Sequence, residues 1–177
     1  LKSMNNGKEY SVIDYQKDEV TIEKYSYKSG KKIKTILNSS DLDSLKFDNY
    51  EFNYSEDKVL LQVESEPIYR YSEKSFVYAY DLKSNTLIKI SEKKISLPEF
   101  SPNGKMISYV YNNNLFIYDI ISKQTTQCTK DGKKNKIIYG ATDWVYEEEF
   151  ALVKGYEWSY DSKYIAYYRF DESNVKE

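Results

Sequence analysis

Short stretches of alternating apolar and polar residues run along the whole chain and are separated by turn residues. The stretches that are richest in β-branched and aromatic residues have the length of strands: 10–15, 20–25, 75–80 and 114–118. The segments 28–30, 83–85, 102–104 and 131–132 contain residues that favour turns. This spacing predicts an all-β protein, which could be a sandwich, a barrel or a propeller.

A repeat within this pattern favours the propeller. Three segments share an aromatic residue, a serine, a turn and a lysine before an apolar strand: Tyr54–Leu61, Phe100–Ile107 and Trp158–Ile165. Within the unit, Tyr-Asp-Leu at 80–82 and Tyr-Asp-Ile at 118–120 each end a later strand. The repeat therefore predicts a four-stranded unit of roughly 40–50 residues, the size of a propeller blade. About three and a half such blades fit into the chain, too few to close a ring.

Two segments depart from the blade plan and are predicted to be insertions. The first is Glu64–Lys74, which contains Arg70, and the second is Lys130–Gly155, which contains the acidic run 143–150. Insertions into a repeat usually gather on one face of the molecule, and this is often the binding face.

The acidic run predicts a short helix with Thr142 or Asp143 as its N-cap. Its apolar side chains are expected to dock the helix onto the propeller: Trp144, Val145, Tyr146 and Phe150. Adjacent carboxylates repel one another unless a cation is present, and a primary ammonium has three donors with which it can bridge two of them. A solvated acidic turn or a calcium or magnesium site is the alternative, although the EF-hand spacing is absent.

Composition limits the chemistry that these residues can perform. The chain has no histidine, which excludes a Ser-His-Asp or Cys-His arrangement among its 177 residues. Its single cysteine, Cys128, lies in a strand-like segment and is predicted to be a small buried side chain. A formal net charge of −2 creates no field that would attract nucleic acid. No apolar run approaches the ~20 residues that a transmembrane helix needs.

The sequence resembles the propeller of dipeptidyl peptidase IV and its bacterial relatives. The resemblance is strongest in the strings at 142–150 (TDWVYEEEF), 156–163 (YEWSYDSK) and 165–172 (IAYYRFDE). It extends back through 69–72, 80–82 and 100–104, and so covers essentially the whole chain. The acidic string is the specific part, because the blade repeat alone matches many propellers. Just after it, the stretch from Phe150 is one residue shorter than in the animal enzymes.

This resemblance implies that residues 1–177 are part of an eight-bladed N-terminal propeller whose α/β-hydrolase domain, with a Ser-Asp-His triad, lies outside this chain. It implies a serine exopeptidase that releases N-terminal dipeptides with Pro or Ala second and that needs no cofactor. The family's paired glutamates, which hold the free α-amine of the substrate, match Glu148 and Glu149. The arginine that contacts the substrate's carbonyl or carboxylate region matches Arg70, for which a structural ion pair is the alternative.

Other expectations follow from the same resemblance. Glu147 matches a structural position, so its substitution is expected to matter much less than that of its two neighbours. Arg169 and Asp171 are expected to form a scaffold ion pair. The partners implied are peptides with a free N-terminus, the hydrolase domain and a second copy in a homodimer, in an exported, periplasmic location. A propeller that only binds, and a prolyl tripeptidyl or acylaminoacyl peptidase, are the competing interpretations.

Overall fold

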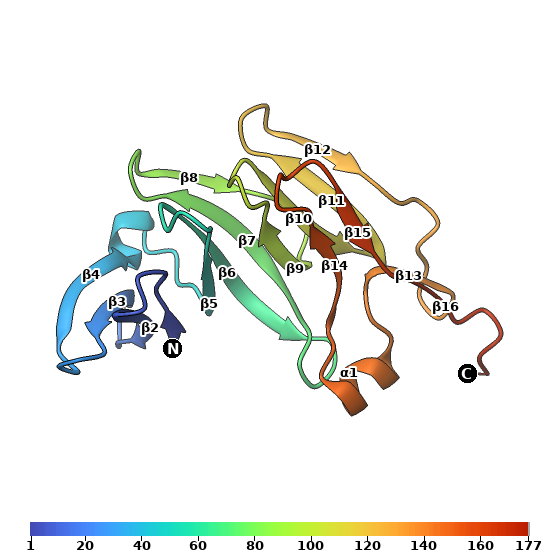
Figure 1. Ribbon diagram of the computed structural model, residues 1–177, viewed down its shortest axis with the longest axis horizontal. Helices are drawn as coiled ribbons and strands as arrows, with labels where there is room; N and C mark the ends of the chain where they lie inside the picture. The colour runs from blue at the N-terminus through green and yellow to red at the C-terminus, as the bar shows by residue number, and fades with distance from the viewer. Residues whose placement is uncertain (177) are drawn as a thin grey trace. The chain divides into compact units, whose positions relative to one another are not determined.

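A computed structural model describes residues 1–176, and its regular secondary structure is β-strand apart from a short 3-10 helix and one short α-helix (Figure 1). The chain divides into two compact units, one of residues 1–64 and 78–88 and the other of residues 65–77 and 89 onward. Strands β6 (Lys58–Pro67) and β7 (Glu73–Asp81) each contribute residues to both units. The all-β prediction is confirmed, and each unit is described below by itself.

The first unit contains a four-stranded antiparallel sheet in sequential order. Its strands are β1 (Lys2–Ser3), β2 (Glu9–Tyr15), β3 (Val20–Ser26) and β4 (Lys32–Asn38). A 3-10 helix, η1 (Ser39–Leu42), follows, then β5 (Asn49–Phe52), which pairs with β6, and β8 (Thr86–Lys89), which pairs with β7. The core of this unit includes the fully buried Ile22, Phe47 and Leu60.

The second unit contains an antiparallel meander of β9 (Ile95–Phe100), β10 (Met106–Tyr111), β11 (Asn114–Asp119) and β12 (Gln124–Gln127). A second sheet has the order β15-β14-β13-β16. Its strands are β13 (Ile137–Ala141), β14 (Lys154–Trp158), β15 (Ile165–Tyr167) and β16 (Arg169–Asp171). Helix α1 (Trp144–Phe150) lies in the connection from β13 to β14. Val110, Leu115 and Tyr156 form a buried cluster to which both sheets contribute. The strands predicted over 10–15, 20–25, 75–80 and 114–118 are confirmed as β2, β3, β7 and β11.

The repeated turn is present, but the predicted register of its first copy is wrong. Ser101 donates its N–H to Met106 O and accepts from Gly104 N, and Ser159 makes the same pair of bonds with Tyr164 and Ser162. In the first copy this position is Asn53 and not Ser55, because Asn53 N donates to Lys58 O and Asn53 O accepts from Glu56 N.

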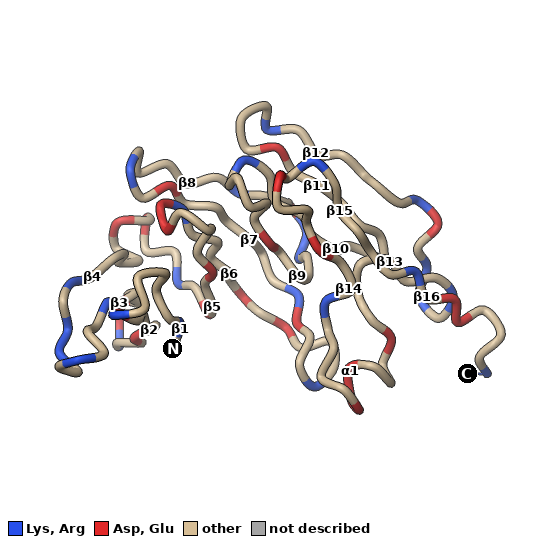
Figure 2. Tube along the Cα trace, in the orientation of Figure 1, with Lys and Arg blue, Asp and Glu red and all other residues tan. Residues whose placement is uncertain are grey.

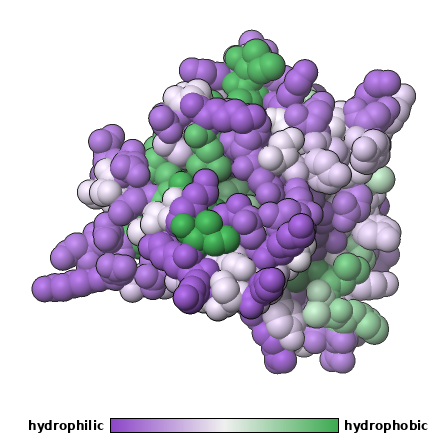
Figure 3. Space-filling view, turned by 60° about the vertical axis from the view of Figure 1, so that its left-hand side comes forward, coloured by the Kyte–Doolittle hydropathy of each residue, from purple (hydrophilic) through white to green (hydrophobic). Residues whose placement is uncertain are grey.

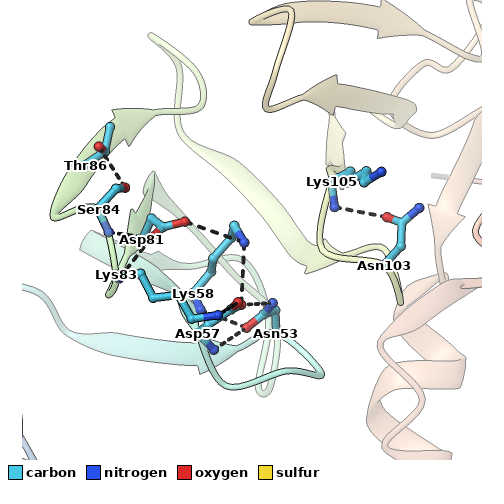
Figure 4. A network of polar contacts seen from close by, with 9 residues as sticks. All are labelled: Asn53, Asp57, Lys58, Asp81, Lys83, Ser84, Thr86, Asn103 and Lys105. Atoms are coloured by element: carbon cyan, nitrogen blue, oxygen red, sulfur yellow. Dashed lines mark hydrogen bonds and ion pairs between the residues drawn. The ribbon is translucent and has the colours of Figure 1, made fainter.

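The side chain of Asn53 explains how asparagine replaces serine here. Its Oδ1 accepts from the backbone N–H of Asp57 and Lys58 at 3.1 and 2.9 Å (Figure 4). In the second copy the Ser101 hydroxyl oxygen accepts from Met106 N at 3.0 Å. Both side chains satisfy backbone donors that the tight turn leaves unpaired, as Asx and ST turns do. Asp57, not Lys58, is therefore the structural counterpart of Lys105.

Two further predictions are corrected in the second unit. The segment Lys130–Gly155 is not wholly an insertion, because it contains β13, which pairs with β14 and β16. Cys128 is exposed and follows the end of β12, so the prediction of a buried side chain is wrong. Strand β12 is exposed at all four of its positions, and Cys128 continues this exposed stretch.

The surface shown in Figure 3 is mostly hydrophilic and is interrupted by separate hydrophobic patches. This agrees with the 31% of charged residues in the sequence. Among the residues described, no helix has both the length and the apolar character required to cross a membrane.

Gly140 allows β13 to approach the core closely, and its replacement by alanine is expected to destabilise the fold. Its φ is +71°, and a Cβ there would lie 3.1 Å from Val110 Cγ2 and 3.2 Å from Leu115 Cδ1. The left-handed backbone costs a non-glycine residue about 1–2 kcal/mol, and overpacking a core adds about 1–3 kcal/mol. Comparing the thermal unfolding midpoints of the wild type and Gly140→Ala measures this loss of stability.

Gly30→Ala is the matched control, because Gly30 has φ +64° but nothing within 4 Å of its built Cβ. The Gly30→Ala variant therefore carries only the cost of the left-handed backbone, without any overpacking of the core. A Gly140→Ala variant no less stable than Gly30→Ala would show that β13 does not depend on this close approach.

Candidate functional site

Helix α1 is fixed at both ends by local contacts. Of the two predicted N-cap candidates, Asp143 is the N-cap, and its Oδ1 accepts from Tyr146 N at 2.9 Å. Ala151 ends the helix in the left-handed conformation, with φ 52°, and its N–H donates to Glu147 O at 3.0 Å. The hydroxyl of Thr142 donates to Leu152 O and closes the loop below the helix. These contacts determine the directions in which the three glutamates point.

The helix buries a glutamate and leaves its aromatic residues exposed, which is the reverse of the prediction. The four apolar residues expected to dock the helix have exposed fractions of 42–70%: Trp144, Val145, Tyr146 and Phe150. Glu147 is only 3% exposed and is the one buried residue of α1. Tyr146 contacts the rings of Phe150 and Phe170, at centroid distances of 5.7 and 5.2 Å, without becoming buried.

Glu147 is bound to the predicted insertion that contains Arg70. This insertion is an extended hairpin of β6 and β7 whose tip, residues 68–72, is closed by a hydrogen bond from Ile68 N to Ser72 O. Oε1 of Glu147 accepts from Tyr71 N and from Ser72 N, each at 2.8 Å. A buried carboxylate needs such donors to replace lost water. The predicted structural role of Glu147 is confirmed by these contacts.

The next glutamate contacts the arginine itself. Arg70 Nε lies 2.9 Å from Glu148 Oε2, with the Arg70 side chain 63% exposed and that of Glu148 15% exposed. Glu149 follows and is exposed. Figure 2 shows acidic positions along α1 and a basic position at the hairpin tip that contacts it. The structure thus brings Arg70 and Glu148 together, with Glu149 adjacent.

The surroundings of this pair are acidic. Burial raises the pKa of Tyr69, and the negative charges of Glu172, Glu147 and Asp143 raise it further. Burial also raises the pKa of Glu172, and Asp143 adds to this effect. Within residues 1–176, no three or more carboxylate or thiol side chains are arranged to hold a metal ion. A field of this sign favours a cationic ligand.

Arg169 and Asp171 form the ion pair that was predicted, with Nη1 and Oδ2 separated by 3.2 Å. Arg169 Nε also donates to the hydroxyl of Tyr139 at 3.1 Å. These contacts link β16 to β13, so the pair belongs to the scaffold of the second sheet.

Sequence reasoning missed the contribution of Tyr71 and Ser72. Both act through their backbone N–H, which every non-proline residue possesses, so no pattern of side chains could have identified them. The only signal was their position directly after Arg70.

Comparisons with known proteins show the family of the chain. Residues 53–177 match the family described as "Dipeptidyl peptidase IV (DPP IV) N-terminal region". The chain is 31% identical over 173 residues to prolyl endopeptidase FAP of Homo sapiens, covering 96% of this chain and 22% of that protein. It is 35% identical over 121 residues to dipeptidyl aminopeptidase B of Saccharomyces cerevisiae, covering 68% of this chain and 15% of that protein.

Solved structures give the same result. The crystal structure of Porphyromonas gingivalis dipeptidyl peptidase 4 superposes with a TM-score of 0.90 at 36% identity, covering 99% of this chain and 25% of that one. TolB from Acinetobacter baumannii, at 14% identity and a TM-score of 0.52, shares the fold alone. The chain spans between 15% and 25% of the length of these three proteins: FAP, dipeptidyl aminopeptidase B and dipeptidyl peptidase 4. It belongs to the dipeptidyl peptidase IV N-terminal region family and forms part of that region's β-propeller.

Proposed function

We propose that this chain is the substrate-orienting part of a serine exopeptidase that releases dipeptides from peptide N-termini, with Pro or Ala as the second residue. The observation that carries the proposal is the meeting of Arg70 and Glu148 at 2.9 Å in acidic surroundings, with Glu149 exposed beside them. Relatives named dipeptidyl aminopeptidase and dipeptidyl peptidase 4 support it.

The two glutamates bind the substrate's α-ammonium in this proposal. An ammonium has three N–H donors, and its hydrogen bonds to carboxylates are charge-assisted. Glu148 is mostly buried but keeps part of its side chain accessible, and Glu149 is exposed. The ammonium would therefore join a carboxylate that already faces Arg70 and gain a second from Glu149.

Arg70 has donors left for the substrate. A guanidinium carries five N–H groups, and the contact with Glu148 uses Nε. The side chain is 63% exposed, so its terminal nitrogens can reach a carbonyl oxygen of the bound peptide. A lysine at this position would be less suited to contacting Glu148 and a substrate carbonyl at the same time, because its ammonium lacks the planar fork of arginine.

An amine held at this point limits the length of the product. Two residues of extended peptide span roughly 7 Å at about 3.5 Å per residue. A nucleophilic serine at that distance attacks the carbonyl of the second residue, and a dipeptide leaves. The serine and its triad partners would come from an α/β-hydrolase domain outside residues 1–177, and the chain would supply about three and a half blades of an eight-bladed ring. An exported location and a homodimer are part of the same proposal.

Comparing free and blocked amines tests this function. The full-length protein should hydrolyse a chromogenic Ala-Pro amide with a kcat/KM at least about 30-fold higher than that of its N-acetyl counterpart. Acetylation removes the positive charge and two of the three donors, and losing a desolvated charged contact costs about 2–5 kcal/mol.

Equal hydrolysis of both substrates would contradict anchoring by the amine and would indicate an endopeptidase. Binding of the free-amine substrate without turnover would indicate a propeller that only binds.

A further inference from the structure

We infer that Glu147 is a positioning residue: its buried carboxylate holds the hairpin tip that carries Arg70 against α1, and so sets where Arg70 lies relative to Glu148 and Glu149. The inference rests on the proposed function and deepens it. It replaces the expectation from the sequence that Glu147 matters much less than its neighbours.

The hydrogen bonds of Glu147 act on the backbone next to Arg70. Its Oε1 accepts from Tyr71 N and Ser72 N at 2.8 Å, across 76 and 75 residues of sequence. Tyr71 follows Arg70 directly, and the amide of Tyr71 belongs to the planar peptide unit that includes the Cα of Arg70. Fixing this amide therefore restrains the point from which the Arg70 side chain extends. The hydrogen bond from Ile68 N to Ser72 O closes the tip around the same point.

The contact between Arg70 and Glu148 is a weaker restraint than the contacts of Glu147. Arg70 is 63% exposed, and exposed ion pairs contribute little to stability because water competes and a long side chain loses its freedom. Glu147 is 3% exposed, so water does not compete for its oxygen. Its partners are backbone amides, which lose no side-chain freedom on binding. The position of the tip therefore depends on Glu147.

Helix geometry allows both contacts at once. At 3.6 residues per turn, consecutive side chains point about 100° apart. Glu147 can therefore point inward to the tip's backbone while Glu148 points to the arginine side chain. The three consecutive glutamates have three different environments: Glu147 is buried, Glu148 is mostly buried with part of its side chain accessible, and Glu149 is exposed.

The test compares Glu147→Gln with Glu147→Leu in the full-length protein. Glutamine keeps a carbonyl oxygen that can accept from both amides, whereas leucine of similar size cannot. Glu147→Leu should lower kcat/KM for a free-amine dipeptidyl substrate roughly 10- to 100-fold, since small misplacements of binding groups have effects of this size. The loss should appear mainly in KM, and Glu147→Gln should recover most of it.

A second measurement reports on the tip without using activity. Trypsin should cleave after Arg70 faster in Glu147→Leu than in the wild type, because the tip is released. Glu23→Leu is the matched control: Glu23 is also 3% exposed, lies in the other unit and pairs with Lys32. It should lower the unfolding midpoint without changing KM or cleavage after Arg70.

Arg70→Ala provides a background that separates positioning from a general structural role. If Glu147 acts by placing Arg70, Glu147→Leu should lower kcat/KM clearly less in this background than in the wild type, a non-additivity expected of coupled residues.

Full additivity would overturn the inference, as would near-wild-type KM for Glu147→Leu beside an impaired Arg70→Ala. If Arg70→Ala, Glu148→Ala and Glu149→Ala were all neutral, the proposed function would fail. Tryptic cleavage would still decide whether Glu147 holds the tip.

Discussion

Replacing Glu148 or Glu149 by alanine is expected to reduce kcat/KM of the full-length protein for free-amine dipeptidyl substrates by about 30- to 5,000-fold. The range follows from the roughly 2–5 kcal/mol lost when one partner of a desolvated charged contact is truncated and from a factor of ten per 1.36 kcal/mol. Steady-state kinetics with a chromogenic dipeptide amide measures the change.

The two substitutions differ in one respect that the structure makes visible. Glu148→Ala also removes the partner of Arg70, whereas Glu149→Ala leaves that ion pair intact. We therefore expect Glu148→Ala to have the larger effect. N-acetylated substrate should be little affected by either change, because its ammonium is already absent.

Glu157→Ala is a control of the same chemistry. Glu157 is an exposed glutamate of β14 that pairs with Lys154 at 2.9 Å. Its removal should leave kcat/KM unchanged. Near-wild-type kinetics for both Glu148→Ala and Glu149→Ala would show that the acidic run is only a structural turn.

The 177-residue chain by itself is expected to release no product from any peptide or chromogenic dipeptide. It contains no histidine to act as general base and no Gly-x-Ser-x-Gly nucleophile elbow. The expected difference from the full-length protein is therefore a complete loss of turnover. A serine-directed fluorophosphonate probe should label the full-length protein and leave the chain unlabelled.

The control for this experiment is the full-length protein purified by the same steps. Turnover by the chain that survives rigorous purification, in constant proportion to protein, would overturn the assignment of catalysis to a separate domain.

The strands were predictable because alternation of apolar and polar residues is a local property of the sequence. The repeated turn was harder, since Asn53 and Ser101 perform the same task with different side chains. The pattern of a shared serine and lysine therefore selected Ser55 and Lys58 in place of Asn53 and Asp57.

The orientation of α1 could not be predicted from its own residues. Hydrophobicity favours burying Trp144 and Phe150, yet Glu147 is the residue that is buried. The deciding partners are backbone amides 75 and 76 residues away, and their arrangement exists only once the hairpin has formed. The proximity of Arg70 to the acidic run was expected from family resemblance, and no spacing rule connects the two segments.

The separation of these contacts along α1 has an evolutionary consequence. The contacts with the hairpin tip come from Glu147 and Glu148. The left-handed turn at Ala151 and the hydrogen bond from Thr142 to Leu152 O instead fix the return of the chain after the helix. A change of loop length after Phe150 alters the return path to β14 and not the register of the glutamates. Insertions and deletions should therefore be tolerated after Phe150 and selected against between Asp143 and Glu149.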